Sequence, residues 1–152
     1  MKNSDKWKNR FISLAKEIST WSKDPSTQIG CVAIEPETGR ILSVGYNGFP
    51  EGIEDSEKRL NDRQEKYKYV IHAEKNCIYN ACKNGISLEG CHFYVYGYPT
   101  CSECTKSIVQ VGASSVFYKM KEKGVVNPKW MDENKISESI YAEVGLSYEE
   151  IK

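Results

Sequence analysis

Apolar residues recur at helical spacing near the start of the chain. Within residues 5–21 a large apolar side chain occurs at every third or fourth position, namely Trp7, Phe11, Leu14, Ile18 and Trp21. This spacing places them on one face of a helix, because an α-helix completes a turn about every 3.6 residues. The Asp24-Pro25 pair ends the pattern, since proline disfavours helical backbone in the residue before it. The sequence therefore predicts an amphipathic helix over residues 5–21.

Shorter apolar runs later in the chain are typical of strands. Residues 29–34 and 40–46 flank a Pro-Glu-Thr-Gly turn and predict a β-hairpin. The other predicted strands and helices follow from β-branched and aromatic runs and from helical spacing, and they cover residues 72–84 (helix), 91–96 (strand), 104–111 (helix), 115–119 (strand) and 134–143 (helix). Strands and helices alternate in this second half. This alternation predicts an α/β domain with parallel neighbouring strands late in the chain.

A Gly- and Pro-rich loop at 47–55 and a strongly charged segment at 57–69 separate the hairpin from the helix at 72–84. We interpret the charged segment as a solvated helix or loop, because charged runs usually face water. Trp130 and Tyr141 are expected to pack the last helix. The chain shows no internal repeat, and residues 1–152 are expected to form one domain.

Charge and hydropathy narrow the classes of partner. The 152 residues include 21 Lys and Arg and 21 Asp and Glu, so the net charge is zero. This balance argues against strong binding to long nucleic acids, which normally needs a basic surface. No apolar run approaches the roughly 18 residues of a membrane span, and the N-terminal residues contain no apolar signal region. We therefore expect a cytoplasmic protein that does not interact with membranes.

The chain has six cysteines, and two of them have the spacing of metal ligands. Cys101 and Cys104 form a C-x-x-C motif at the start of a predicted helix, where positions three apart share one face. The positive end of the helix dipole favours the thiolate form that binds zinc. The other four cysteines lie in apolar or helical contexts and are interpreted as small buried residues. Taken alone, the C-x-x-C motif is also typical of a redox pair or of half a structural zinc site.

A histidine elsewhere in the chain completes a metal-binding set. His72 opens a predicted helix after an apolar segment, and with Cys101 and Cys104 it supplies three ligands. Three protein ligands leave one position of a tetrahedral zinc open, as in catalytic rather than structural sites. Cys91 and His92 are the nearest candidates for a fourth ligand, but we interpret His92 as an ordinary surface or strand-edge histidine.

Glu74 stands two positions after His72 and could serve as a proton carrier. A single carboxylate beside a metal-activated water can take the water proton and pass it on to a ring nitrogen and a leaving amine. The alternative is an acidic first-turn residue that merely favours the helix dipole. In an ideal helix, positions 72 and 74 lie on rather different sides. The pair therefore requires that the first turn lie directly against the metal.

At these residues the chain resembles the cytidine deaminase superfamily, whose signature is H-x-E followed by P-C-x-x-C. The segments 22–30, 45–50 and 71–76 are similar to those of the deoxycytidylate (dCMP) deaminase family, and the resemblance covers about residues 5–120. It implies a three-layer α/β/α fold with a mixed central sheet of about five strands. It also implies hydrolysis of dCMP to dUMP and ammonia with one catalytic zinc ion, in the pyrimidine deoxynucleotide metabolism that supplies dTTP.

The resemblance also implies roles for individual residues. Glu74 would be the catalytic residue, the side chain of Asn47 would bind the sugar hydroxyl, and the backbone of Ala73 would read the cytosine edge. Lys23 and Ser26 would bind the phosphate, since an ammonium and a hydroxyl suit a small dianion. Pro99 would line the substrate loop.

Members of this family are commonly hexamers that dCTP activates and dTTP inhibits, with Mg²⁺ helping the triphosphate to bind. By position, the resemblance assigns such an effector site to Gly48, Phe49, Gly52, Asn80 and Lys83. The family resemblance thus predicts a homohexamer with a nucleotide substrate and two nucleotide effectors.

Two departures from the family pattern and several alternatives remain. Thr100 separates Pro99 from Cys101, and Glu51 follows the loop at 45–50. The first alters the substrate loop and the second could alter phosphate or effector binding. Within the same chemistry, the alternatives are deamination of dCTP, cytidine, cytosine, guanine or tRNA adenosine. Outside it, they are a nonenzymatic zinc-binding module and a thioredoxin-like redox protein.

Overall fold

The computed structural model describes residues 1–121 and 128–152. Its helices and strands follow one another along the chain in the order α1 (Asp5–Ser19), β1 (Gly30–Ile34), β2 (Ile41–Tyr46), α2 (Glu57–Asn61), α3 (Arg63–Tyr69), α4 (Ala73–Lys83), β3 (His92–Gly97), α5 (Ser102–Gln110), β4 (Ser115–Met120), α6 (Pro128–Val144) and β5 (Ser147–Glu150).

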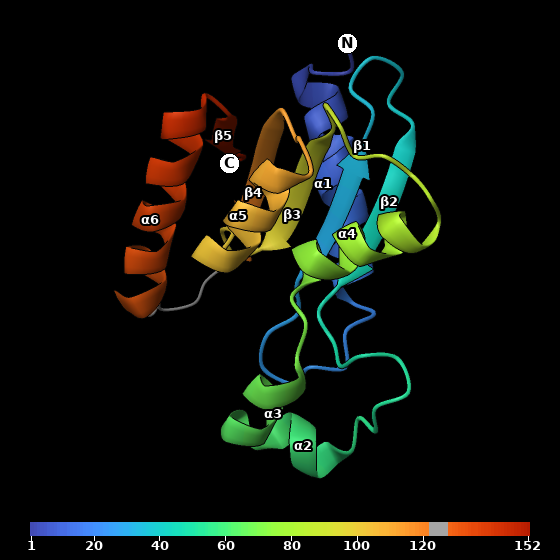
Figure 1. Cartoon of the computed structure of the whole chain (residues 1–152), viewed down its shortest axis with the longest axis vertical. Helices are drawn as coiled ribbons and strands as arrows, with labels where there is room; N and C mark the ends of the chain where they lie inside the picture. The colour runs from blue at the N-terminus through green and yellow to red at the C-terminus, as the bar shows by residue number, and fades with distance from the viewer. Residues whose placement is uncertain (122–127) are drawn as a thin grey trace.

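One five-stranded sheet organises these elements, with the strand order β2-β1-β3-β4-β5 (Figure 1). β1 pairs antiparallel with both β2 and β3, whereas β3, β4 and β5 run parallel. The predicted hairpin and the predicted parallel neighbours are both confirmed. β5 was not predicted from the sequence, because its four residues, SYEE, are polar and mostly exposed and carry no apolar run.

Helices cover both faces of the sheet. α1 packs on one face, where Phe11 and Ile18 join Val32, Tyr94 and Phe117 in one core cluster. α4 and α5 pack on the other face and contribute most of the helical residues of the second cluster, to which β3 adds Phe93 and Val95. Neighbouring residues of β3 thus point into opposite layers, as strand geometry requires. The three-layer α/β/α arrangement predicted from the family resemblance is confirmed.

The first helix ends earlier than its apolar pattern indicates. Ser4 caps it by accepting a hydrogen bond from the Trp7 N–H at 3.5 Å. It ends at Ser19 rather than at residue 21, and Trp21 is 55% exposed and lies edge-on to the Tyr46 ring. The prediction that Trp21 belongs to the buried stripe is therefore wrong. Near Ser19 the hydroxyls of Ser19 and Thr20 bond the carbonyls of residues 16 and 17, and the chain then leaves the helix.

Two later segments also differ from their predictions. The charged segment 57–69 forms the short helices α2 and α3, but Lys66 is only 5% exposed, so the segment is not wholly solvated. α6 begins at residue 128 rather than 134 and buries only Ser137 and Tyr141. The early turns of α6 carry no apolar stripe and were missed for that reason. Packing of Tyr141 beneath the last helix is confirmed, since the side chain is 1% exposed.

The remaining cysteines and His92 separate into buried and exposed sites. Cys31, Cys77 and Cys91 lie in the core, as predicted, whereas Cys82 is exposed on α4. His92 is 4% exposed, so its interpretation as a surface or strand-edge residue is wrong. The reason is topological, because β3 is the middle strand of the sheet and all six of its residues are buried.

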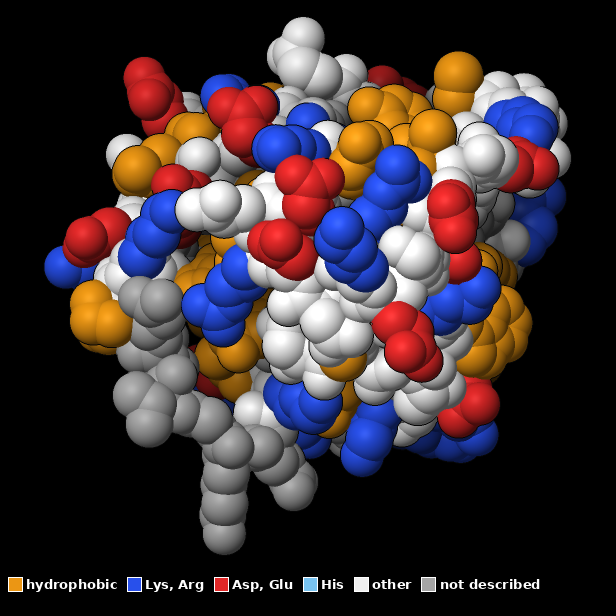
Figure 2. Space-filling view, turned by 90° about the horizontal axis from the view of Figure 1, so that it is seen from below, with side chains coloured by type: hydrophobic (Ala, Val, Ile, Leu, Met, Phe, Trp, Pro, Cys, Tyr) orange, Lys and Arg blue, Asp and Glu red, His pale blue; other side chains and the backbone are white. Residues whose placement is uncertain are grey.

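The surface shows no concentration of one sign of charge on the face seen in Figure 2, where basic and acidic side chains alternate. This mixture agrees with the net charge of zero. Among the described residues, no helix combines the length and the apolar character that crossing a membrane demands.

One close backbone contact sets the position of α4 on the sheet. A Cβ atom at Gly45 of β2 would lie 2.3 Å from the Cys77 nitrogen and 2.5 Å from the Ala73 oxygen. Only glycine allows the main chains of β2 and α4 to approach so closely. Because Ala73 is the first residue of α4, this contact also positions the start of that helix.

We predict that Gly45→Ala destabilises the protein by about 3 kcal/mol, since main-chain atoms cannot yield to the new methyl group as a flexible side chain would. Urea unfolding measures this change. Gly48→Ala is the matched control, because a Cβ there meets no atom within 4 Å, and we expect a change within about 0.5 kcal/mol. Equal midpoints for the two variants would contradict the direct packing of α4 on β2.

Candidate active site

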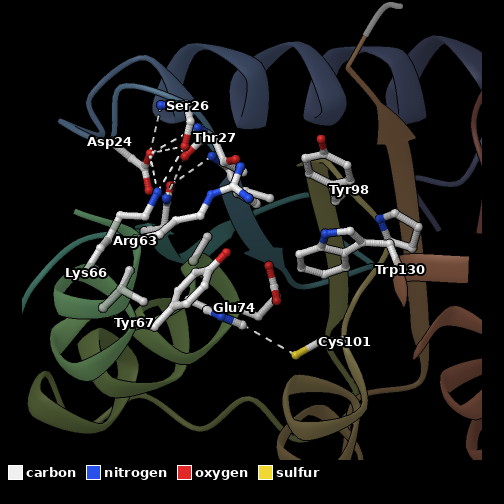
Figure 3. Close-up of a pocket in the computed structure, with 16 residues that line it drawn as sticks. Asp24, Ser26, Thr27, Arg63, Lys66, Tyr67, Glu74, Tyr98, Cys101 and Trp130 are labelled. Atoms are coloured by element: carbon white, nitrogen blue, oxygen red, sulfur yellow. Dashed lines mark hydrogen bonds and ion pairs between the residues drawn. The ribbon is translucent and has the colours of Figure 1, made fainter. Parts of the chain in front are cut away.

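A cavity of about 310 Å³ lies where the starts of α4 and α5 meet the loop that precedes β1. The α3 helix forms one side with Arg63, Lys66 and Tyr67, and Tyr98 and Trp130 lie on the opposite side (Figure 3). The Tyr98 and Trp130 rings stack, with centroids 5.2 Å apart and planes at 17°. The cavity thus has a polar side and an aromatic side.

Two helices begin at the floor of this cavity. His72 is the N-cap of α4 and Cys101 is the N-cap of α5, and both have extended backbone there. The Cys101 sulfur accepts a hydrogen bond from the Cys104 N–H at 3.5 Å. The N-terminal ends of two helices, each with a positive partial charge, therefore converge on the same group of side chains.

The three predicted metal ligands are brought together. Each of the Cys101 and Cys104 sulfurs lies 3.4 Å from the His72 Nδ1. Tetrahedral zinc with ordinary Zn–S and Zn–N bonds requires a separation of about 3.6 Å between such atoms. No fourth His, Cys, Asp or Glu joins this group within residues 1–121 and 128–152. The residues therefore fit a zinc ion with one position left for a non-protein ligand.

The protonation of the group also suits a metal. Hydrogen bonds from Cys104 and from the His72 ring lower the pKa of Cys101 to about 4, although burial opposes this. The same Cys101 contact raises the pKa of His72. The pKa of Cys104 is raised, first by its contact with Cys101 and then by burial. A lowered pKa at Cys101 favours its thiolate, the form that binds zinc.

Glu74 projects into the cavity beside these ligands (Figure 3). Its side chain is 4% exposed, and burial raises the pKa of the carboxyl group. His72 and Glu74 can face the same space although positions two apart in a helix point in different directions. His72 precedes α4 with φ −67° and ψ 155°, so it does not follow the helical rotation, and both residues line one cavity.

A buried ion pair orders the polar side of the cavity. The Lys66 ammonium lies 3.2 Å from an Asp24 carboxylate oxygen and donates to the Ser26 hydroxyl at 3.0 Å. The same Asp24 oxygen accepts hydrogen bonds from the backbone N–H groups of Ser26 and Thr27. Burial opposes ionisation of Asp24, but these backbone bonds and Lys66 together lower its pKa. The pair is therefore neutral as a unit and holds the Ser26 loop in place.

Arg63 is a cation that lines the cavity and that no sequence pattern marked as a site residue. Its side chain reaches from α3 toward the middle of the cavity (Figure 3). Lys66, its neighbour on α3, is engaged by Asp24, whereas no hydrogen bond or ion pair occupies Arg63 among the described residues. The segment 57–69 contains eight charged residues, so nothing in its sequence marked Arg63 or Lys66 as different from the rest.

The predicted substrate residues divide between two places. Ser26, Asn47, Ala73 and Pro99 line the cavity beside Glu74. Lys23 does not, because it lies at a second, smaller cavity, with its exposed ammonium 2.6 Å from Asp55. That contact raises the pKa of Lys23. The structure therefore leaves Lys23 outside the cavity that holds the zinc-ligand group.

The Asn47 side chain makes two structural hydrogen bonds and still has hydrogen-bonding groups left for a ligand. Its Oδ1 accepts from the Ile29 N–H at 2.8 Å, and its Nδ2 donates to the Thr27 carbonyl at 2.8 Å. These bonds fix the backbone that enters β1. One amide proton and one lone pair remain for a ligand.

The predicted effector residues are dispersed. Gly48 and Phe49 line the second cavity, of about 150 Å³. Asn80 instead donates to the Val44 carbonyl at 2.8 Å, and Lys83 pairs with Glu51 at 3.2 Å. Gly52 has a φ of +89° in an open turn. An effector site for dCTP or dTTP with Mg²⁺, and a hexameric assembly, stay predictions.

Comparison with known proteins identifies relatives that match most of the chain. It is 36% identical over 141 residues to an uncharacterized deaminase in the luxG 3′ region of Aliivibrio fischeri, covering 93% of this chain and 90% of that protein. It is 38% identical over 117 residues to human deoxycytidylate deaminase, covering 74% of this chain and 64% of that one. The crystal structure of a dCMP deaminase from the cyanophage S-TIM5 superposes with a TM-score of 0.75 at 21% identity, covering 97% of this chain and 99% of that chain.

The family comparison agrees with the geometry of the site. Residues 5–120 match the model of the cytidine and deoxycytidylate deaminase zinc-binding region, a span that includes His72, Glu74, Cys101 and Cys104. The resemblance inferred from the sequence is thereby confirmed, and the donor set agrees with the zinc that the family description names. The chain belongs to the cytidine and deoxycytidylate deaminase family.

Proposed function

We propose that this protein hydrolyses dCMP to dUMP and ammonia, as a step toward dTTP. The observation that carries the proposal is that buried Glu74 lines the same cavity as His72 and Cys101 of the metal-ligand group and as Arg63, which has no hydrogen-bond or ion-pair partner among the described residues. The relatives named deoxycytidylate deaminases support the choice of substrate. The cavity has room for a nucleotide-sized ligand, since small-molecule sites begin at about 300 Å³.

His72, Cys101 and Cys104 would hold the zinc ion, which when bound makes water nucleophilic at neutral pH by lowering its pKa to about 7. Glu74 accepts a proton from the attacking water and delivers it to the ring nitrogen N3 of cytosine. The water oxygen bonds to C4, and Glu74 carries the second proton from this oxygen to the amino group as the bond from C4 to nitrogen breaks, which leaves the C4 carbonyl of dUMP. Water is consumed and ammonia leaves, so atoms and charges balance.

The rest of the cavity would orient the nucleotide. Asn47 has one amide proton and one lone pair for the sugar hydroxyl, and the first N–H groups of α4, beginning at Ala73, face the base. The phosphate would lie at Ser26 and Arg63. A guanidinium suits this role because it can bind two phosphate oxygens at once. Lys66 would act through Asp24 and Ser26 rather than as a free charge.

A panel of substrates tests the assignment. We expect turnover of dCMP to exceed that of deoxycytidine, guanine and dCTP, measured by release of ammonia under identical conditions. Metal analysis by mass spectrometry should find one zinc per chain, because the described residues contain one such ligand group. Turnover of only the unphosphorylated compounds would contradict the nucleotide assignment. A reversible Cys101–Cys104 disulfide without stoichiometric metal would instead favour the redox alternative.

Glu74→Gln should strongly lower turnover while the protein keeps its zinc and its fold. The amide has nearly the same shape but cannot carry the proton, and the loss of general acid–base catalysis lowers kcat by about 10²- to 10⁴-fold. Steady-state kinetics and metal analysis measure the two properties separately. Glu103→Gln is the matched control, because Glu103 lies next to the same metal ligands but is exposed and bonded to Lys106. Near-normal kcat in Glu74→Gln would refute the mechanism.

Arg63→Gln should lower kcat/KM for dCMP by about 10- to 100-fold, mainly through KM, because a hydrogen bond to a charged group is worth about 1.5–3 kcal/mol. Deoxycytidine has no phosphate, so its kcat/KM should change little. Lys23→Gln is the control, since Lys23 lies at the second cavity and is paired with Asp55. A larger effect on dCMP from Lys23→Gln than from Arg63→Gln would show that the phosphate lies at the second cavity instead.

A further inference from the structure

The C-terminal helix α6 docks on the protein through hydroxyl groups rather than through an apolar stripe. Its buried residues are Ser137 and Tyr141, whereas Met131, Ile136 and Val144 are about half exposed. A surface helix normally buries an apolar face. Buried polar contacts contribute little net stability but restrict geometry strongly. The Tyr141 ring belongs to the apolar core, but the hydroxyl contacts of this interface indicate a role beyond stabilising the core.

Four hydroxyls form one buried hydrogen-bond chain between α6 and the start of α5. Thr100 Oγ1 lies 2.9 Å from Thr105 Oγ1 and 2.9 Å from Tyr141 Oη. Thr105 donates to the Ser137 hydroxyl at 2.9 Å, and Ser137 donates to the Thr100 carbonyl at 2.7 Å. All four side chains are at most 1% exposed. The Ser137 hydroxyl bonds the carbonyl of Thr100, whose own hydroxyl makes two of the other bonds. The hydrogen-bond chain therefore returns to Thr100.

The direction of every bond in this chain follows from counting protons. A hydroxyl has one proton to donate. Thr105 gives its proton to Ser137, so it must accept from Thr100. Thr100 has then used its proton and must accept from Tyr141. The order runs from Tyr141 through Thr100 and Thr105 to Ser137, so removal of any one hydroxyl leaves a buried group without its partner.

Two members of this hydrogen-bond chain flank the two predicted cysteine ligands in the sequence. Thr100 directly precedes Cys101, and Thr105 directly follows Cys104. Two more contacts from the same face of α6 reach this region: the Glu133 carboxylate accepts from the Ser102 N–H at 3.0 Å, and Trp130 stacks on Tyr98. The four α6 residues 130, 133, 137 and 141 recur every three or four positions, which is the spacing of one helical face.

We propose that this face of α6 positions the zinc-binding C-x-x-C element, with Ser137 and Tyr141 as positioning residues that act through Thr100 and Thr105. Thr100, the residue that separates Pro99 from Cys101, is then the anchor by which α6 fixes both sulfurs. The inference rests on the proposed zinc site, but not on the identity of the substrate.

The test compares Tyr141→Phe, Ser137→Ala, Thr100→Val and Thr100→Ser with the wild-type chain. Zinc affinity is measured by competition with a chromophoric chelator, and site geometry by the visible absorption of the Co²⁺-substituted protein. Steady-state kinetics with dCMP give kcat and KM. We expect the first three variants to weaken zinc binding by about 10-fold or more, to shift the Co²⁺ bands and to lower kcat with little change in KM. Thr100→Ser, which keeps the hydroxyl, should restore wild-type values.

Two controls separate positioning from loss of stability. Tyr94→Phe removes the hydroxyl of another fully buried tyrosine, one that has no hydrogen-bond partner among the described residues and lies in the α1-side core. Val116→Ala destabilises the apolar cluster that also contains Tyr141, but Val116 makes none of the hydrogen bonds of the hydroxyl chain. Both should keep the Co²⁺ spectrum and zinc affinity of the wild type, even where thermal unfolding shows that Val116→Ala is less stable.

The outcomes are distinct. Wild-type zinc affinity and Co²⁺ spectra in both Tyr141→Phe and Ser137→Ala would overturn the inference, as would equal spectral shifts in Val116→Ala. If Ser137→Ala does not fold, Tyr141→Phe, which keeps the ring, decides alone. A wild-type chain that binds no zinc would refute the zinc site and this inference together. A chain that binds zinc but does not deaminate dCMP would refute only the proposed substrate, and the affinity and Co²⁺ measurements would still test α6.

Discussion

The N-terminal ends of α4 and α5 converge at one cavity, and this convergence brings the predicted metal ligands together. His72 is the N-cap residue of α4 and Cys101 is that of α5, so these predicted metal ligands lie where both helix dipoles are positive. The contact of Gly45 with the main chain of α4 fixes one helix against β2. The other helix follows directly from the buried central strand β3. The sheet therefore holds both helix ends, and through them the N, S and S donor atoms.

Charge around the cavity is distributed so that one cation remains available. Lys66 and Asp24 neutralise each other in a buried pair whose function is to hold the loop at Ser26. Lys23 is neutralised by Asp55 outside the cavity. Arg63 alone projects toward the ligand space without a partner among the described residues. A net charge of zero is thus compatible with local recognition of a small anion such as a nucleotide phosphate.

The C-terminal helix shows how a polar interface can serve a site. An apolar contact tolerates small shifts, because dispersion forces depend weakly on direction, whereas a chain of hydroxyls requires each partner at a defined distance and angle. The bonds from Ser137 and Tyr141 therefore transmit the position of α6 to the backbone beside Cys101 and Cys104. These bonds therefore hold α6 in a defined position although several of its apolar side chains are half exposed.

Elements with local sequence signals could be predicted without the structure. The H-x-E and C-x-x-C motifs identified the candidate metal ligands and the candidate proton carrier, and alternation and helical periodicity predicted α1, the hairpin and the parallel strands. Tertiary contacts determine the remaining features, which are the burial of Lys66 and His92, the pairing of the polar strand β5, the extent of α6 and the position of Arg63 rather than Lys23 at the larger cavity. Each of these depends on a partner far away in the chain, as Lys66 depends on Asp24, 42 positions earlier. Local pattern cannot reveal such partners, because the same charged residue is solvated in one fold and buried in another.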